Sequence, residues 1–268
     1  MMESVNVILK PFTPIDLSII VPSIRVDNLP ALYNSLYNAC SAPFEVIVVG
    51  PYKPPILDKF NVRYIEDWGA PLRAQQIGLS HARGKYIHRA VDDSAYLKDS
   101  LDKALALIDR SDPLSCVNVK FTEGESLIKD KMMLDEFYEL GYHSQAIKLY
   151  TPFKSQVMNF SIIPSSLMGE IGGWDAKTFE TIAFGELDIS LRLQFAGAKP
   201  QLTKYPVIAC TWLPGETGDH KPMNDAFADD AVIYNRIYNS VGCHDRIKID
   251  INNWKDTPNR WIRRFGDA

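Results

Sequence analysis

The sequence lacks a hydrophobic run long enough to cross a membrane. Its longest largely apolar stretches are Leu17–Val21 and Val46–Val49, far short of the roughly 20 residues that span a bilayer. Near the N-terminus, Glu3 stands where a signal peptide carries basic residues. We therefore expect a cytoplasmic protein without a cleaved leader.

Paired cysteines and an excess of positive charge are also missing. The four cysteines lie far apart with no C-x-x-C pair, and this spacing favours buried, reduced thiols over disulfides or a zinc site: Cys40, Cys116, Cys210 and Cys243. Lysine and arginine number 29 against 33 acidic residues, which gives a net charge of −4. A general nucleic-acid-binding surface is therefore not expected, because it would need a basic face to neutralise phosphates.

Alternating strands and helices fill the first half of the chain. The pattern predicts buried strands at Leu17–Val21, Phe44–Val49, Val62–Ile65 and Lys85–Val91, and helices at Leu29–Cys40, Ala70–Arg83 and Leu97–Ile108. Near-continuous apolar strands between helices are typical of a parallel sheet covered on both faces. Ligands of such sheets bind beyond the carboxyl ends of the strands, which is where Asp92 and Asp93 fall.

The second half is less regular. It is expected to hold strands at Cys116–Phe121 and Val157–Ile163, and helices at Ser126–Leu140 and Phe184–Phe195. We divide the 268 residues into segments 1–115 and 116–222 and a C-terminal helical tail, 223–268. The last part of this tail, from Trp254 to Phe265, combines basic and aromatic side chains. Three interpretations of it stay open: an interfacial membrane segment, an oligomer contact, or a final helix docked on the domain.

Three motifs follow one another along the chain. They are the opening strand Ser18–Pro22; the stretch Arg73–Leu79 that continues through Ala82–Ile87 to Asp92 and Asp93; and Gly172–Asp175 followed by Glu186, Leu187, Asp188 and Arg192. In this order and spacing they resemble family 2 glycosyltransferases of the GT-A fold. The resemblance covers most of the chain. It implies an α/β fold with a Rossmann-like, mostly parallel central sheet flanked by helices and a smaller acceptor-side region.

The activity that this resemblance implies is an inverting, metal-dependent sugar transfer in polysaccharide biosynthesis. The donor would be a nucleotide sugar, with UDP as the first choice of nucleotide. The acceptor would be a hydroxyl of a saccharide, a lipid-linked or a protein acceptor. On this view segment 1–115 binds the donor, and segment 116–222 of the same domain binds the acceptor and carries the catalytic group. The tail could add a peripheral membrane contact.

On the donor side, the resemblance assigns six residues to donor binding: Pro22, Ser23, Arg25, Arg73, Asp92 and Asp93. The departing diphosphate gathers negative charge, which Mg²⁺ or Mn²⁺ neutralises with few protein carboxylates. Asp93 is the first choice as metal ligand, with Asp92 and His220 as further candidates. The alternatives are that Asp92 caps a helix beginning near residue 95, that Arg73 is a solvated helix residue and that His220 is a plain surface residue.

The sequence departs from the family pattern at three positions on this side. Gly50 ends the second strand where the family typically has an aspartate, Ser94 replaces a third acid, and Gln76 matches the family's helix asparagine. These positions bear on nucleobase identity and metal dependence. Asp27 is a candidate to compensate for Gly50.

On the acceptor side, an inverting transfer needs a general base beside the acceptor hydroxyl. The family's acidic pair at a helix start matches Glu186 and Asp188, with Glu186 as the predicted base. Asp188 and Arg192 lie four residues apart and could instead form an ion pair. Trp174 and Asp175 match the acceptor-side turn, where the alternative for Trp174 is a buried aromatic.

Other enzyme classes fit less well. No G-x-G-x-x-G or glycine-rich loop follows the first strand, which argues against a dehydrogenase or a nucleotidyltransferase. A catalytically degenerate member that binds nucleotide or sugar without turnover stays open, because Gly50 and Ser94 depart from the family pattern.

Overall fold

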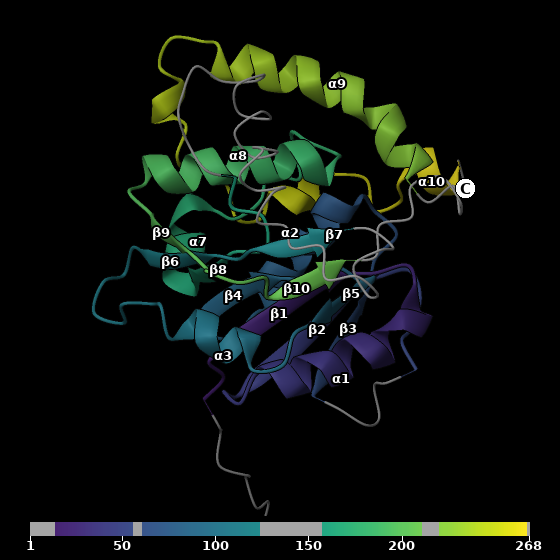
Figure 1. Cartoon of the computed structure of the whole chain (residues 1–268). Helices are drawn as coiled ribbons and strands as arrows, with labels where there is room; N and C mark the ends of the chain where they lie inside the picture. The colour runs from purple at the N-terminus through teal and green to yellow at the C-terminus, as the bar shows by residue number, and fades with distance from the viewer. Residues whose placement is uncertain (1–13, 56–60, 124–156, 211–219, 267–268) are drawn as a thin grey trace, which may run out of the picture.

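A seven-stranded, mostly parallel sheet forms the centre of the molecule (Figure 1). The computed structural model describes residues 14–55, 61–123, 157–210 and 220–266. In spatial order the strands are β3 (Val62–Glu66), β2 (Phe44–Gly50), β1 (Leu17–Pro22), β4 (Tyr86–Arg89), β8 (Ile162–Pro164), β6 (Ser115–Asn118) and β9 (Lys199–Leu202). Strand β8 runs antiparallel to both neighbours, and the other neighbouring pairs are parallel. The predicted α/β sheet is confirmed.

Helices cover both faces of this sheet because successive side chains of a strand point to opposite sides. Ile19 of β1 packs in the same core cluster as helix α1 (Leu29–Ala39). The next residue, Ile20, belongs to the cluster that contains helix α2 (Pro71–His81). Nearly all of β1 is therefore apolar and buried, as expected of a central strand.

The second half of the chain extends the same sheet. Strands β8, β6 and β9 continue the order beyond β4, and helices α7 (Ser165–Ile171) and α8 (Ile182–Phe195) lie on the α2 side. Helix α9 (Lys221–Tyr238) forms the outermost layer over α8 (Figure 1). The two halves thus share one sheet, and the boundaries between the three segments stay a prediction.

A second, three-stranded sheet begins directly after β4. It consists of β5 (Ser94–Tyr96), β10 (Ile208–Cys210) and β7 (Phe121–Glu123). Asp92 is therefore followed by a strand, and the expectation that it caps a helix is wrong. Leu97 N donates to Val207 O at 3.0 Å, which continues this pairing, so the predicted helix at 97–108 begins only at α3 (Ser100–Leu105).

Further differences fall near the C-terminal half. The strand predicted for Val157–Ile163 is reduced to β8, because Phe160 adopts a φ of +52° that no strand residue can have. The helix expected at 126–140 lies outside the described residues. After α9 the chain forms two 3₁₀ turns (Cys243–Asp245 and Asn253–Asp256) and the short helix α10 (Ile262–Phe265). Within the described residues, no helix has the length and apolar character needed to cross a membrane.

Candidate active site

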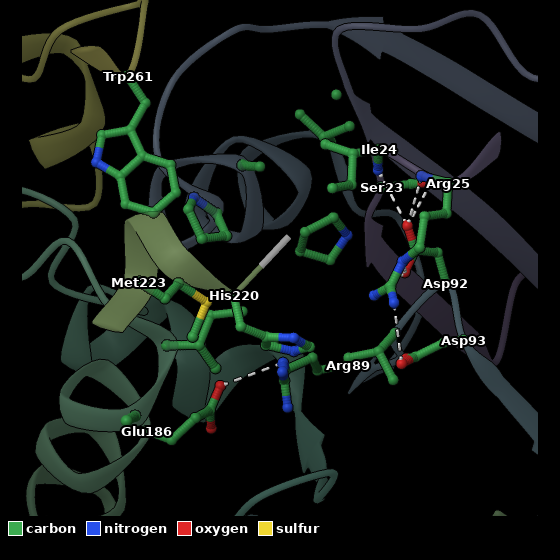
Figure 2. Close-up of a pocket in the computed structure, with 18 of the residues that line it drawn as sticks. Ser23, Ile24, Arg25, Arg89, Asp92, Asp93, Glu186, His220, Met223 and Trp261 are labelled. Atoms are coloured by element: carbon green, nitrogen blue, oxygen red, sulfur yellow. Dashed lines mark hydrogen bonds and ion pairs between the residues drawn. The ribbon is translucent and has the colours of Figure 1, made fainter. Parts of the chain in front are cut away.

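A cavity of about 510 Å³ lies at the carboxyl ends of β1, β2 and β4. This is the position predicted for a ligand of a parallel sheet, and the volume is typical of small-molecule sites. The loop after β1 and the residues after β4 form one wall, while α8 and the C-terminal segment form the other (Figure 2). Seven of the predicted site residues line the cavity: Pro22, Ser23, Arg25, Asp92, Asp93, Glu186 and His220.

Asp92 holds the loop that follows β1. Its Oδ2 accepts hydrogen bonds from Ser23 Oγ at 3.1 Å and from the backbone N–H groups of Ile24 and Arg25 at 3.0 and 2.8 Å. Its Oδ1 accepts from Arg25 Nε at 3.0 Å and lies 2.8 Å from Arg25 Nη2. Both oxygens are thus used by the protein, and this buried carboxylate fixes the shape of the cavity wall.

Asp93 is more available to a ligand. Its Oδ2 lies 3.2 Å from Arg25 Nη1, so the guanidinium bridges the two neighbouring carboxylates. Burial raises the pKa of Asp93, and the charges of Arg25 and, more weakly, of His220 act to lower it. Figure 2 shows His220 in the cavity between Asp93 and Glu186.

The side chains of the cavity could hold a divalent ion only if a bound ligand supplied part of the ion's coordination. Among the residues that the structure describes, no group of three or more His, Cys, Asp or Glu side chains gathers as a metal site. Mg²⁺ and similar ions bind nucleotides through one or two protein carboxylates, with phosphate oxygens and water completing the shell. Asp93 fits this role, whereas both oxygens of Asp92 are already hydrogen-bonded.

Gly50 is required by the close approach of the loop after β1. A Cβ at this position would lie 1.9 Å from the backbone oxygen of Ser23, so the aspartate typical of the family does not fit. Asp27 does not compensate, because it is exposed in a 3₁₀ turn (Val26–Asn28) and does not line the cavity. An acid that sequence reasoning missed, Asp67, lines the cavity just beyond β3.

Arg73 lies behind the cavity wall and holds the C-terminal segment. Its Nε donates to Asp67 Oδ1 at 3.0 Å, and its Nη1 donates to the Trp254 carbonyl and, at 2.9 Å, to Thr257 Oγ1. The guanidinium also lies over the Trp254 ring, 5.1 Å from its centroid. The side chain is buried, so the solvated alternative is wrong. It does not line the cavity, and its donor-binding role stays a prediction.

The tail is docked on the domain through this contact and others. Trp261 N donates to Trp68 O at 2.7 Å, and the Trp68 and Phe265 rings meet edge to face at 5.1 Å. Trp261 and Phe265 line the cavity. Of the three interpretations of the stretch from Trp254 to Phe265, docking on the domain is the one that the described residues display, although as a 3₁₀ turn and the short helix α10; the membrane contact stays a prediction.

Glu186 lies on the α8 side of the cavity and is 5% exposed. Its Oε1 accepts hydrogen bonds from Trp174 Nε1 at 3.1 Å and Gln75 Nε2 at 3.2 Å, and Arg89 Nε lies 3.5 Å away. Burial raises the pKa of Glu186, while Arg89 and the two hydrogen bonds oppose that rise. A carboxyl group with a raised pKa in a cavity is suited to general acid–base chemistry.

Asp188 does not share this environment. Its Oδ2 accepts a hydrogen bond from Arg192 Nε at 2.8 Å, and its Oδ1 accepts from Tyr238 Oη at 2.7 Å and from Arg246. It is fully buried and does not line the cavity. The ion pair anticipated as the alternative is therefore present, and Glu186 is the member of the acidic pair that faces the site.

The predicted acceptor residues also lie outside the cavity lining. Trp174 is buried, and its indole N–H donates a hydrogen bond to Glu186 Oε1. Asp175 is buried, pairs with Arg246 and accepts a hydrogen bond from Thr178 N at 3.0 Å. Both side chains are thus engaged within the protein, and their contact with an acceptor stays a prediction.

Sequence reasoning missed Arg89, which lines the cavity beside Glu186. The available signal was a charged residue near the carboxyl end of a buried strand. Such a position is costly for an unpaired charge and therefore points to a partner in the site. Trp261 was noted only as part of a basic, aromatic tail, and nothing local indicated that it would form a cavity wall.

No family model matches the chain, and no curated protein matches it. Solved structures that resemble it include residues 1–349 of TarS from S. aureus. The complex with UDP superimposes with a TM-score of 0.55 at 17% identity over 84% of this chain and 66% of that chain. The complex with UDP-GlcNAc gives 0.52 at 18% identity, over 75% and 60% of the two chains. This chain thus spans less than two thirds of those proteins, and the likeness confirms the fold.

Proposed function

We propose that this protein transfers a sugar from a nucleotide-sugar donor, with UDP as the nucleotide, to an acceptor hydroxyl. The observation that carries the proposal is one cavity with Glu186 on one side and Asp93 with Arg25 on the other. The fold supports it, because TarS is a glycosyltransferase and has been crystallised with UDP and with UDP-GlcNAc. Fold alone does not define chemistry, so the residues must carry the argument.

The donor end of the cavity is the wall formed by the loop after β1 and by Asp93. The backbone N–H groups of Ile24 and Arg25 donate to Asp92, so this loop would be held in place before a ligand arrives. A divalent ion bound by Asp93 would neutralise charge on the departing diphosphate. His220, which lines the same cavity, is a further candidate ligand.

The acceptor end is the Glu186 wall. Glu186 would take the proton of the acceptor hydroxyl, and the freed oxygen would attack the anomeric carbon of the sugar. The bond between that carbon and the diphosphate oxygen would break, and the nucleoside diphosphate would leave with the electron pair. Direct displacement by this route inverts the anomeric configuration. The acceptor class, whether saccharide, lipid-linked or protein, belongs to the same proposal.

The experiment measures UDP release from UDP-GlcNAc with Mn²⁺ or Mg²⁺, with water and simple glycosides as acceptors, and UDP binding by calorimetry. The proposal expects both binding and release. Binding without release from any of a panel of UDP-sugars would favour the catalytically degenerate alternative. Neither binding nor release with UDP or with GDP, dTDP and CDP donors would reject both.

A further inference from the structure

The strand-end arginine Arg89 is held in place from two sides. It projects from β4, its Nη1 donates to Asn159 Oδ1 at 2.5 Å, and its guanidinium lies over the Phe160 ring, 4.8 Å from the centroid. Phe160 has a φ of +52°, a backbone conformation that non-glycine residues adopt rarely. The backbone around Phe160 thus departs from strand geometry at the point where its ring supports Arg89.

This support places a cation beside one particular atom. Arg89 and Glu186 are each only 6% exposed at the side chain, and Arg89 Nε lies 3.5 Å from Glu186 Oε1 (Figure 2). The same Oε1 accepts the hydrogen bonds of Trp174 and Gln75. Among the described residues, no hydrogen bond or ion pair reaches the other oxygen, Oε2. The carboxylate is therefore held by one oxygen, and the second is left for a ligand.

We propose that Arg89 is a positioning residue, which together with Trp174 and Gln75 fixes Glu186 through Oε1 and leaves Oε2 to receive the acceptor's proton. The catalytic part of this inference rests on the proposed function. The placement of the Arg89 charge beside Glu186 does not rest on the proposed function, because it concerns the protein without substrate. In the transfer step the proton would bind Oε2, while the three groups on Oε1 keep their contacts.

The physical need for such a cation follows from burial. An ionised carboxylate without a partner is strongly disfavoured in a dry site, so an isolated Glu186 would stay protonated and could not act as a base. The groups that face it are Arg89 from β4, Gln75 from α2 and Trp174 from the turn before α8, with His220 across the cavity. Only Arg89 among these three contacts carries a permanent charge. It is therefore the group that most favours the ionised form.

The test is a titration of the Glu186 carboxyl in the free protein, labelled with ¹³C-glutamate and assigned by the resonance that Glu186→Gln removes. Arg89→Gln is expected to raise the pKa of Glu186 by about one unit or more, since a neighbouring opposite charge lowers a carboxyl pKa by about 1–3 units. Arg89→Lys, which keeps the charge, is expected to remain closer to wild type. Arg83→Gln is the matched control, because Arg83 pairs with Glu45 at 2.8 Å and does not line the cavity.

An unchanged titration in Arg89→Gln would overturn the inference. If that variant does not fold, Trp174→Phe replaces it, because it removes a neutral donor from Oε1 and should raise the pKa by a smaller amount; no rise there would overturn the inference equally. In the pH profile of UDP release, the pH below which the rate declines should rise together with the pKa of Glu186. A wild-type protein without turnover would count against the proposed function, while the titration would still decide the role of Arg89.

Discussion

Glu186 and Asp188 lie two residues apart on α8, and their carboxylates occupy different environments. Glu186 lines the cavity, whereas Asp188 is fully buried against Arg192, with Oδ2 and Nε 2.8 Å apart. Residues two apart on a helix do not share a face, so this separation follows from helix geometry. We therefore expect substitution of Glu186 to affect activity and substitution of Asp188 to affect stability.

Glu186→Gln keeps the shape of the side chain and removes the carboxylate that we propose as the general base. We expect UDP release to fall by about 10²–10⁴-fold, the range typical of a lost general base. UDP affinity should change little, because Glu186 lies across the cavity from Asp93. Steady-state kinetics and calorimetry on the same preparation check both parts, and full activity in the variant would exclude Glu186 as the base.

Asp188→Asn should act on stability instead. It leaves the buried Arg192 and the partly buried Arg246 without their shared counter-charge. Breaking a buried pair from one side costs about 3–5 kcal/mol. Urea denaturation measures this loss, with Asp112→Asn as the control because Asp112 forms its ion pair with the exposed Lys199. A loss no greater than that of the control would contradict the structural role.

Asp93→Ala tests the metal. In the wild type, a bound ligand at a hundred times its Kd adds about 2.7 kcal/mol of stability, and we expect Mn²⁺ to increase the stabilisation that UDP gives. Asp93→Ala should abolish this increase while leaving the melting temperature of the free protein near that of wild type. Thermal melts with and without Mn²⁺ provide the measurement.

Asp92→Ala is the contrasting variant at the neighbouring position. It should lower the melting temperature without any ligand, because Ser23, Ile24 and Arg25 lose their common acceptor. Identical behaviour of the Asp92 and Asp93 variants would show that the division of roles between them is wrong.

His88 makes stability depend on pH. It is fully buried, its Nε2 lies 2.7 Å from Tyr96 Oη, and burial lowers its pKa from 6.5 to about 4. Between these values the unfolded chain binds more protons than the folded one, so the free energy of unfolding falls as pH decreases. The contribution is about 1.4 kcal/mol per pH unit. Urea denaturation across this pH window should show a steeper decline in the free energy of unfolding for wild type than for His88→Gln. Equal slopes would contradict the role of His88.

The sheet and its ligand-binding edge could be predicted because their signals are local. Apolar runs such as those of β1 and β2 can be buried on both faces only as central strands. Parallel strands place their carboxyl ends at one edge, so Asp92 and Asp93 were expected at the site from chain order alone.

Side chains that motif spacing assigned to the site lie outside the cavity lining where they meet a partner far along the chain. Arg73 contacts Trp254 and Thr257, which lie 181 and 184 residues away along the chain. Asp175 meets Arg246 in the same way. Motif spacing describes one segment at a time, and it carries no information on which distant segment takes up a charged group.

The sequence by itself determined the α/β architecture, the edge of the sheet at which the cavity lies and the acids that stand near it, since strand period, helix period and motif order are properties of neighbouring residues. Only the tertiary structure decided how those acids are used. Asp92 became a support for the β1 loop, Asp188 a buried ion pair and Glu186 a cavity carboxylate beside Arg89. Burial and charge pairing between segments distant in the chain set each role.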